Sequence, residues 1–174
     1  MKKIALIFAN GTEEIEALTT KDVLFRAGVK CDIVSVSGIT PVGSHDIKVV
    51  ADLTEKDFNI DEYDGIIIPG GMPGSVNIKN SDIIKNAVIK AFNDKKLVAG
   101  ICASPAVCLK NFGVTKGKKV TCYPAEVFYN EFTQETYTSK DVEVDGNLIT
   151  ANGIKSAMAF SLAICDFLGV TPKF

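Results

Sequence analysis

Short apolar runs that alternate with helix-like segments constrain the fold of this chain more than any other feature. The runs at 3–8, 65–68 and 97–101 are almost continuously apolar and too short for helices of a core. A strand that is apolar on both faces is typical of a parallel sheet with helices on both sides. The pattern therefore predicts an α/β fold with a mostly parallel sheet between two layers of helices.

The remaining segments predict the order of the elements. A second strand is expected at 30–35, and the first helix is expected to begin at a Thr12 cap and to end at Gly28. The turn signal Asp145-Gly146-Asn147 predicts a hairpin of strands 142–144 and 148–151. Helices are expected at 13–27, 81–94, 104–111, 125–132 and 155–168, and short strands at 41–43, 47–51 and 119–122.

Size and composition exclude several classes of protein. The chain has 174 residues, 47% apolar and 23% charged, which fits one globular domain over 1–174. A net charge of −2 offers no basic surface for nucleic acid. No apolar run approaches the roughly 18 residues of a membrane-spanning helix. His45 is the single histidine, which excludes the usual multi-histidine zinc sites, so neither a metal nor a cofactor is predicted.

The cysteines indicate a reducing compartment. They form an odd set of five without a Cys-x-x-Cys pair, and no export signal is visible. Reduced thiols in a cytoplasmic protein are therefore expected.

Cys102 is the strongest candidate for chemistry. It follows the apolar run 97–101 directly, and the small residues Gly100, Ala103 and Ser104 surround it. This spacing resembles a nucleophile elbow with a thiol in place of the hydroxyl. A helix that starts behind the cysteine would lower the pKa of the thiol, and Cys102 is expected to be the only cysteine with a depressed pKa. The alternative is a small buried cysteine that fills core space.

Two other segments are expected at the same edge of the sheet, because the carboxyl ends of parallel strands meet there. Gly70-Gly71 follows the run 65–68, and its backbone N–H groups suit an anion nest, although a flexible turn explains the glycines equally well. Glu13 and Glu14 fit the positive end of the first helix. Glu16, next to an inward-facing Ile15, is expected to point along the cleft and to serve as a proton shuttle.

Four segments together resemble the ThiJ/PfpI superfamily, in the branch of the Parkinsonism-associated protein deglycase and bacterial ThiJ-like proteins. The resemblance implies a flavodoxin-like three-layer sandwich and a homodimer with the first helix in its interface. It assigns Cys102 as nucleophile, Glu16 as its carboxyl partner, and the Gly71 and Ala103 amides as the oxyanion hole. The segments that carry it are Asn10-Gly11-Thr12-Glu13-Glu14-Ile15-Glu16, Tyr63-Asp64-Gly65-Ile66-Ile67-Ile68-Pro69-Gly70-Gly71, Ala99-Gly100-Ile101-Cys102-Ala103 and Ile149-Thr150-Ala151-Asn152-Gly153.

The chain departs from some relatives beside the nucleophile. Tyr123 occupies the position before a proline where they carry a histidine, which argues against a Cys-His dyad. His45 lies where relatives place an arginine near the dimer interface, so it is either a surface residue or a group that reaches the partner's site. Cys122 is a candidate redox-active thiol because it precedes Tyr123. The other three cysteines are expected to pack in the core: Cys31, Cys108 and Cys165.

Three functions are compatible with this reading. The preferred one is a glutathione-independent, metal-free glyoxalase or deglycase that uses Cys102 and Glu16 on methylglyoxal or early glycation adducts. The second is a redox sensor or stress chaperone in which Cys102 oxidises to a sulfinate beside protonated Glu16. The third, a peptidase or amidase, needs a base that the chain lacks.

Overall fold

A sheet of seven strands forms the centre of the fold in the computed structural model, which describes residues 1–174. The strand order is β3-β2-β1-β4-β5-β9-β8, and every neighbouring pair is parallel except the hairpin β8–β9. The strands are β1 (Lys3–Phe8), β2 (Lys30–Ser35), β3 (Leu53–Thr54), β4 (Gly65–Ile68), β5 (Leu97–Ile101), β8 (Val142–Asp145) and β9 (Leu148–Ala151).

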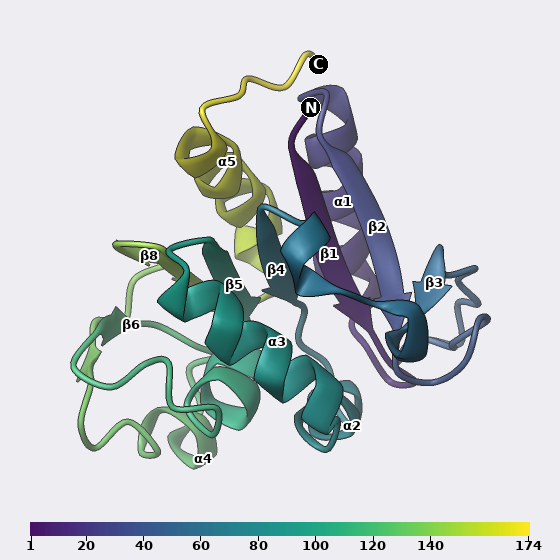
Figure 1. The fold of residues 1–174 in the computed structure, drawn as a ribbon. Coiled ribbons are helices and arrows are strands. Elements are labelled where there is room, and N and C mark those ends of the chain that lie inside the picture. Colours follow the sequence, from purple (N-terminus) through teal and green to yellow (C-terminus); the bar gives the residue numbers. More distant parts are fainter.

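Helices cover both faces of this sheet (Figure 1). On one face, α1 (Glu14–Arg26) and α5 (Ala157–Leu168) pack on Ile4, Leu6 and Phe8. On the other, α2 (Gly74–Lys79), α3 (Asp82–Asn93) and a π-helical turn (Pro105–Leu109) pack on Ala5 and Ile7. Successive residues of β1 thus enter opposite cores, which is why its sequence is apolar throughout. No helix of the structure combines the length and the apolar character that spanning a membrane requires.

The predicted α/β class is confirmed, and five strands have the predicted bounds: β1, β2, β4, β5 and β9. The predicted hairpin is also present, with β8 one residue longer than expected. The predicted start of the first helix is wrong. Glu13 is the N-cap, since its carboxylate accepts a hydrogen bond from Ile15 N–H at 3.3 Å. The Thr12 hydroxyl instead accepts from Ala9 N–H at 2.9 Å, so it closes the turn between β1 and α1.

The predicted strands at 41–43 and 47–51 are absent, and one antiparallel bridge, Val42 with Lys48, stands in their place. The two segments still pair through bonds from Gly43 N–H to Ile47 O at 2.9 Å and from Val49 N–H to Pro41 O at 3.0 Å. The reciprocal bonds are missing, because Pro41 has no N–H and Ile47 N–H donates to Glu14 Oε1 at 3.5 Å.

Differences elsewhere are smaller. The helix expected at 125–132 is only α4 (Glu126–Tyr129), and the helix expected at 104–111 is the π-helical turn. The strand at 119–122 is the shorter β6 (Lys119–Val120), which pairs with an unpredicted β7 (Thr136–Tyr137) in a separate two-stranded sheet. A 3₁₀ turn at Ile154–Ser156 leads into α5. The sequence did not indicate α2 or β3.

Candidate active site

Cys102 lies at the carboxyl end of β5 in a strained backbone conformation, with φ of 65°. Its N–H donates to Ala151 O at 2.9 Å, and its carbonyl accepts from Tyr123 N–H at 2.8 Å. The Ser104 hydroxyl donates to Ile68 O at 2.7 Å, which ties the turn after β5 to the neighbouring strand β4. A non-glycine residue keeps a left-handed conformation only where its surroundings enforce it. The nucleophile-elbow geometry expected from the sequence is therefore present.

The small residues around Cys102 have a steric reason. A Cβ on Gly100 would lie 2.7 Å from Leu109 Cδ1, and one on Gly70 would lie 2.5 Å from the Cβ of Cys102 and 2.7 Å from Glu16 Oε2. Gly70 thus leaves the space in which the thiol and the carboxyl of Glu16 meet. The sequence indicated Gly70 only as part of the Gly70-Gly71 pair and did not predict that it makes this space.

Glu16 projects from α1 into the interior and is only 1% exposed. Its Oε2 accepts a hydrogen bond from Gly70 N–H at 2.7 Å, while Oε1 is buried without a hydrogen-bond partner. Burial raises the pKa of Glu16 to about 7, although the Gly70 amide and the Cys102 thiol oppose the shift. The predicted inward direction of Glu16 is confirmed. The companion expectation is wrong, because Ile15 is 52% exposed and faces outward.

The backbone amides of Gly71 and Ala103 both point at the sulfur of Cys102 and favour its thiolate. Burial and the neighbouring Glu16 nevertheless outweigh these amides and raise the pKa of the thiol to about 12. The expected depressed pKa is therefore wrong, since the thiol is largely buried and a second acid lies in the same small space. Two adjacent anions repel, so Glu16 and Cys102 titrate as a coupled pair.

The other four thiols are buried, and Cys102 is the one that is partly accessible. Burial raises the pKa of Cys122 to about 12, and its sulfur donates to Tyr123 O at 3.3 Å. Cys31, Cys108 and Cys165 also lie in the cores, as the sequence predicts.

Glu14 does more than complement the helix dipole. Its carboxylate is buried and accepts hydrogen bonds from His45 N–H at 2.8 Å and from Ser44 Oγ at 3.2 Å, and it lies 2.9 Å from His45 Nδ1. Burial alone would raise the pKa of Glu14, but the bonds from His45 lower it to about 2. The same contact raises the pKa of His45. Residues 31 apart form this clamp, and nothing in the sequence indicated it.

One group of side chains has the spacing of a cation site. The donor atoms of Glu13, Glu14 and His45 all lie within 4.8 Å of one another. Hydrogen bonds from Ser44 and His45 already occupy the Glu14 carboxylate. The hydrogen bonds between Glu14, Ser44 and His45 therefore explain why these side chains lie together.

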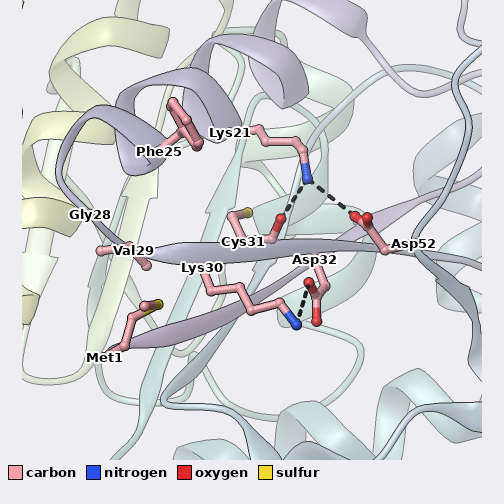
Figure 2. Close-up of a pocket in the computed structure, with 9 residues that line it drawn as sticks. All are labelled: Met1, Lys21, Phe25, Gly28, Val29, Lys30, Cys31, Asp32 and Asp52. Carbon is pink, nitrogen blue, oxygen red and sulfur yellow. Dashed lines mark hydrogen bonds and ion pairs between the residues drawn. The ribbon is translucent and has the colours of Figure 1, made fainter.

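Two pockets of similar size lie at opposite edges of the sheet. One of about 430 Å³ adjoins the Cys102 turn and includes Tyr123, Asn152 and Lys155. The other, of about 420 Å³, lies at the start of β2 between Phe25 and Cys31 (Figure 2). The thiol of Cys31 is buried, whereas Cys102 is the one thiol that is partly accessible. The chemistry thus points to the pocket beside Cys102.

Comparison with known proteins agrees with this fold. Protein dj-1beta of Drosophila melanogaster is 35% identical over 175 residues, which cover 99% of this chain and 93% of that protein. Protein DJ-1 homologs B and A of Arabidopsis thaliana are 37% and 35% identical over 96% of this chain, which spans only 38% and 43% of their length. The structure of Toxoplasma gondii DJ-1, oxidized, matches with a TM-score of 0.89 at 33% identity and covers 97% of this chain and 91% of that one.

These matches confirm the resemblance and the flavodoxin-like fold that it implied. The model of the DJ-1/PfpI family matches residues 2–166, which is nearly the whole chain. The chain therefore belongs to the DJ-1/PfpI family.

Proposed function

We propose that the chain is a cysteine-dependent, glutathione-independent enzyme of the cytoplasm that acts on methylglyoxal or on early glycation adducts. The observation that carries the proposal is the strained Cys102 turn, which places the thiol against the buried carboxyl of Glu16. With Cys102 as nucleophile and Glu16 as base, the reaction needs neither a metal nor a cofactor.

The first step forms a bond between the sulfur of Cys102 and the aldehyde carbon of methylglyoxal. The thiol proton passes to the Glu16 carboxylate, which a pKa of about 7 makes a competent base near neutral pH. The aldehyde oxygen becomes an oxyanion, and the Gly71 and Ala103 amides are its expected hydrogen-bond donors. After protonation of this oxygen, the product is a hemithioacetal.

Glu16 then moves the proton from the former aldehyde carbon to the neighbouring carbon by way of an enediol. The hemithioacetal becomes a thioester of a 2-hydroxy acid, without net oxidation or reduction. Water hydrolyses the thioester, which releases lactate and regenerates the thiol. An adduct on an amine or a thiol would enter the same sequence after loss of that group, which amounts to deglycase activity.

The second candidate is a redox sensor of the stress response. Its support is the accessibility of Cys102 alone among the thiols, together with a carboxyl that could donate a hydrogen bond to an oxidised sulfur. One solved relative, Toxoplasma gondii DJ-1, is described as oxidized. A peptidase is disfavoured because His45 bonds to Glu14 and no other histidine exists.

The decisive experiment measures lactate formation from methylglyoxal without glutathione. We expect many turnovers per wild-type chain, and a loss of at least 100-fold in Cys102→Ser and Glu16→Gln. Glu16→Asp is the matched variant that keeps the acid and shortens its reach. Stoichiometric consumption of methylglyoxal, or wild-type turnover in Glu16→Gln, would contradict the proposal. Peroxide oxidation of Cys102 without lactate formation would favour the redox sensor.

A further inference from the structure

The pocket beside Cys102 is lined by two segments that bond to, or directly follow a residue that bonds to, the backbone of Cys102. One wall begins at Tyr123, whose N–H donates to Cys102 O at 2.8 Å. The other wall, residues 152–156, follows Ala151, whose carbonyl accepts from Cys102 N–H at 2.9 Å. A Cβ on Gly153 would lie 3.5 Å from Tyr123 Cδ2, so the two walls come close together at this point. A ligand in this pocket therefore lies next to the reactive turn.

Two charged side chains of opposite sign line the pocket, Asp141 and Lys155. Neither of them takes part in any ion pair of the protein. Asn152 Nδ2 donates to Asp141 Oδ1 at 2.9 Å, and Ser156 Oγ donates to Asn152 Oδ1 at 2.6 Å. This chain of hydrogen bonds leads from the buried Ser156 to Asp141 and holds the acid in place. The pocket thus offers one fixed carboxylate and one ammonium group without a partner.

We infer that this pocket binds the α-ammonium and α-carboxylate groups of a free amino acid whose side chain carries the aldehyde adduct. Asp141 faces the ammonium group, and Lys155 faces the carboxylate. The inference rests on the proposed function, for which it names the substrate class. A ligand with a single charge meets one attractive and one repulsive group here, whereas a zwitterion satisfies both. Tyr123, Pro124 and Ile154 provide the apolar surface for the side chain.

This assignment predicts that adducts on free amino acids and adducts on proteins differ as substrates. Inside a polypeptide the α-amino and α-carboxyl groups are part of peptide bonds and carry no charge. Adducts on free amino acids should therefore react faster than the same adducts on protein side chains.

The test uses inert ligands, so it does not depend on turnover. Norleucine carries both charges, N-acetylnorleucine only the negative one, norleucinamide only the positive one, and N-acetylnorleucinamide neither. Isothermal titration calorimetry on the wild-type protein is expected to show binding of norleucine that is at least tenfold tighter than binding of the other three. Equal binding of all four, or no binding of norleucine, would overturn the inference.

Two substitutions locate the site. Lys155→Gln removes the partner of the carboxylate, so it should abolish the preference for norleucine over norleucinamide. Asp141→Asn removes the partner of the ammonium group, so it should abolish the preference for norleucine over N-acetylnorleucine. Lys140→Gln and Asp166→Asn are matched controls, because these residues do not line the pocket. Thermal unfolding checks that every variant is folded. An unchanged preference in both pocket variants would refute the site. The lactate assay tests the proposed enzyme activity separately, so an absence of turnover would leave the binding result valid.

Discussion

At the scale of single residues, the site places two acids in a space that tolerates one negative charge. Glu16 is buried beside Cys102, and burial raises the pKa of both groups. The charge of Glu16 raises the pKa of the thiol further, whereas the hydrogen bond from the thiol lowers the pKa of Glu16. The amides of Gly70, Gly71 and Ala103 offset part of this cost, because they donate to the carboxylate or to the sulfur. The position of one shared proton therefore decides which group is the nucleophile and which is the acid.

Cys102 should be the first of the five thiols to react with limiting iodoacetamide, because the other four are buried. Glu16→Gln should increase its rate several-fold at pH 8, since the variant removes the charge that raises the pKa of the thiol. Peptide mass spectrometry measures the site and the rate. Preferential labelling of Cys31 or Cys122 would contradict the burial of those two thiols in the structure.

Glu16 should also make the protein less stable as the pH rises. Its pKa is about 7 in the folded protein against an ordinary 4.5, so the folded state binds this proton more tightly. The stabilisation is complete below pH 4.5 and is lost as the pH rises through 7, a change of roughly 3 kcal/mol.

Urea unfolding at pH 5 and pH 7.5 measures this change. The difference in the free energy of unfolding between wild type and Glu16→Gln should shift by most of that amount, about 2 kcal/mol, because the other groups titrate alike in both proteins. A difference that stays constant with pH would contradict the raised pKa of Glu16.

At the scale of elements, the turns after β1, β4 and β5 interlock. Glu13 N–H donates to Gly70 O at 3.0 Å, which ties the start of α1 to the turn after β4. Gly71 continues that turn with φ of 95° and brings its amide to Cys102. The site is therefore assembled from three turns at one sheet edge, each of which holds another in place.

Gly71→Ala should destabilise the fold by about 3 kcal/mol or more. A Cβ there would lie 2.4 Å from Glu13 N and 2.5 Å from Gly11 O, and both are backbone atoms. Gly113→Ala is the matched control, because it has φ of 80° but open space around it. That substitution should cost only the left-handed strain of about 1–2 kcal/mol. Equal losses in chemical denaturation would show that the close approach at Gly71 is unimportant.

At the scale of the whole molecule, the segment from Ser44 to Asp52 runs along α1. His45 lies 2.9 Å from Glu14 at one end of the helix, and Asp52 lies 3.2 Å from Lys21 farther along. Apolar side chains are exposed here, with Phe25 at 77% and Val50 at 75%. Exposed apolar side chains on two adjoining segments fit an interface between proteins.

We propose that this face forms the homodimer that the resemblance implies. Light scattering at micromolar concentration should give the mass of two chains, and the double variant Phe25→Glu, Val50→Glu should give the mass of one. Ile83→Glu on α3 is the control, since its side chain is 43% exposed on the other face of the sheet. A monomeric wild type would contradict the proposed dimer.

Local patterns in the sequence determined most of the architecture. The four central strands have the predicted bounds because runs that are apolar on both faces have few alternatives to burial in a parallel sheet. Cys102 was also recognisable, since a strained turn needs small neighbours that are adjacent in the sequence. The missing strands near Val42 show the limit of such patterns, because Ile47 N–H donates to the carboxylate of Glu14, a residue 33 positions away, and not to the opposite segment.

Only the tertiary structure decided the electrostatics of the site. The contact between Glu16 and Gly70 joins residues 54 apart, and that between Glu14 and His45 joins residues 31 apart. The pKa of Cys102 is the clearest case, since the helix start alone predicts a low value, whereas burial of the thiol and the neighbouring Glu16 raise it. A pKa depends on burial and on every nearby charge, and both arise from segments that are distant in the chain.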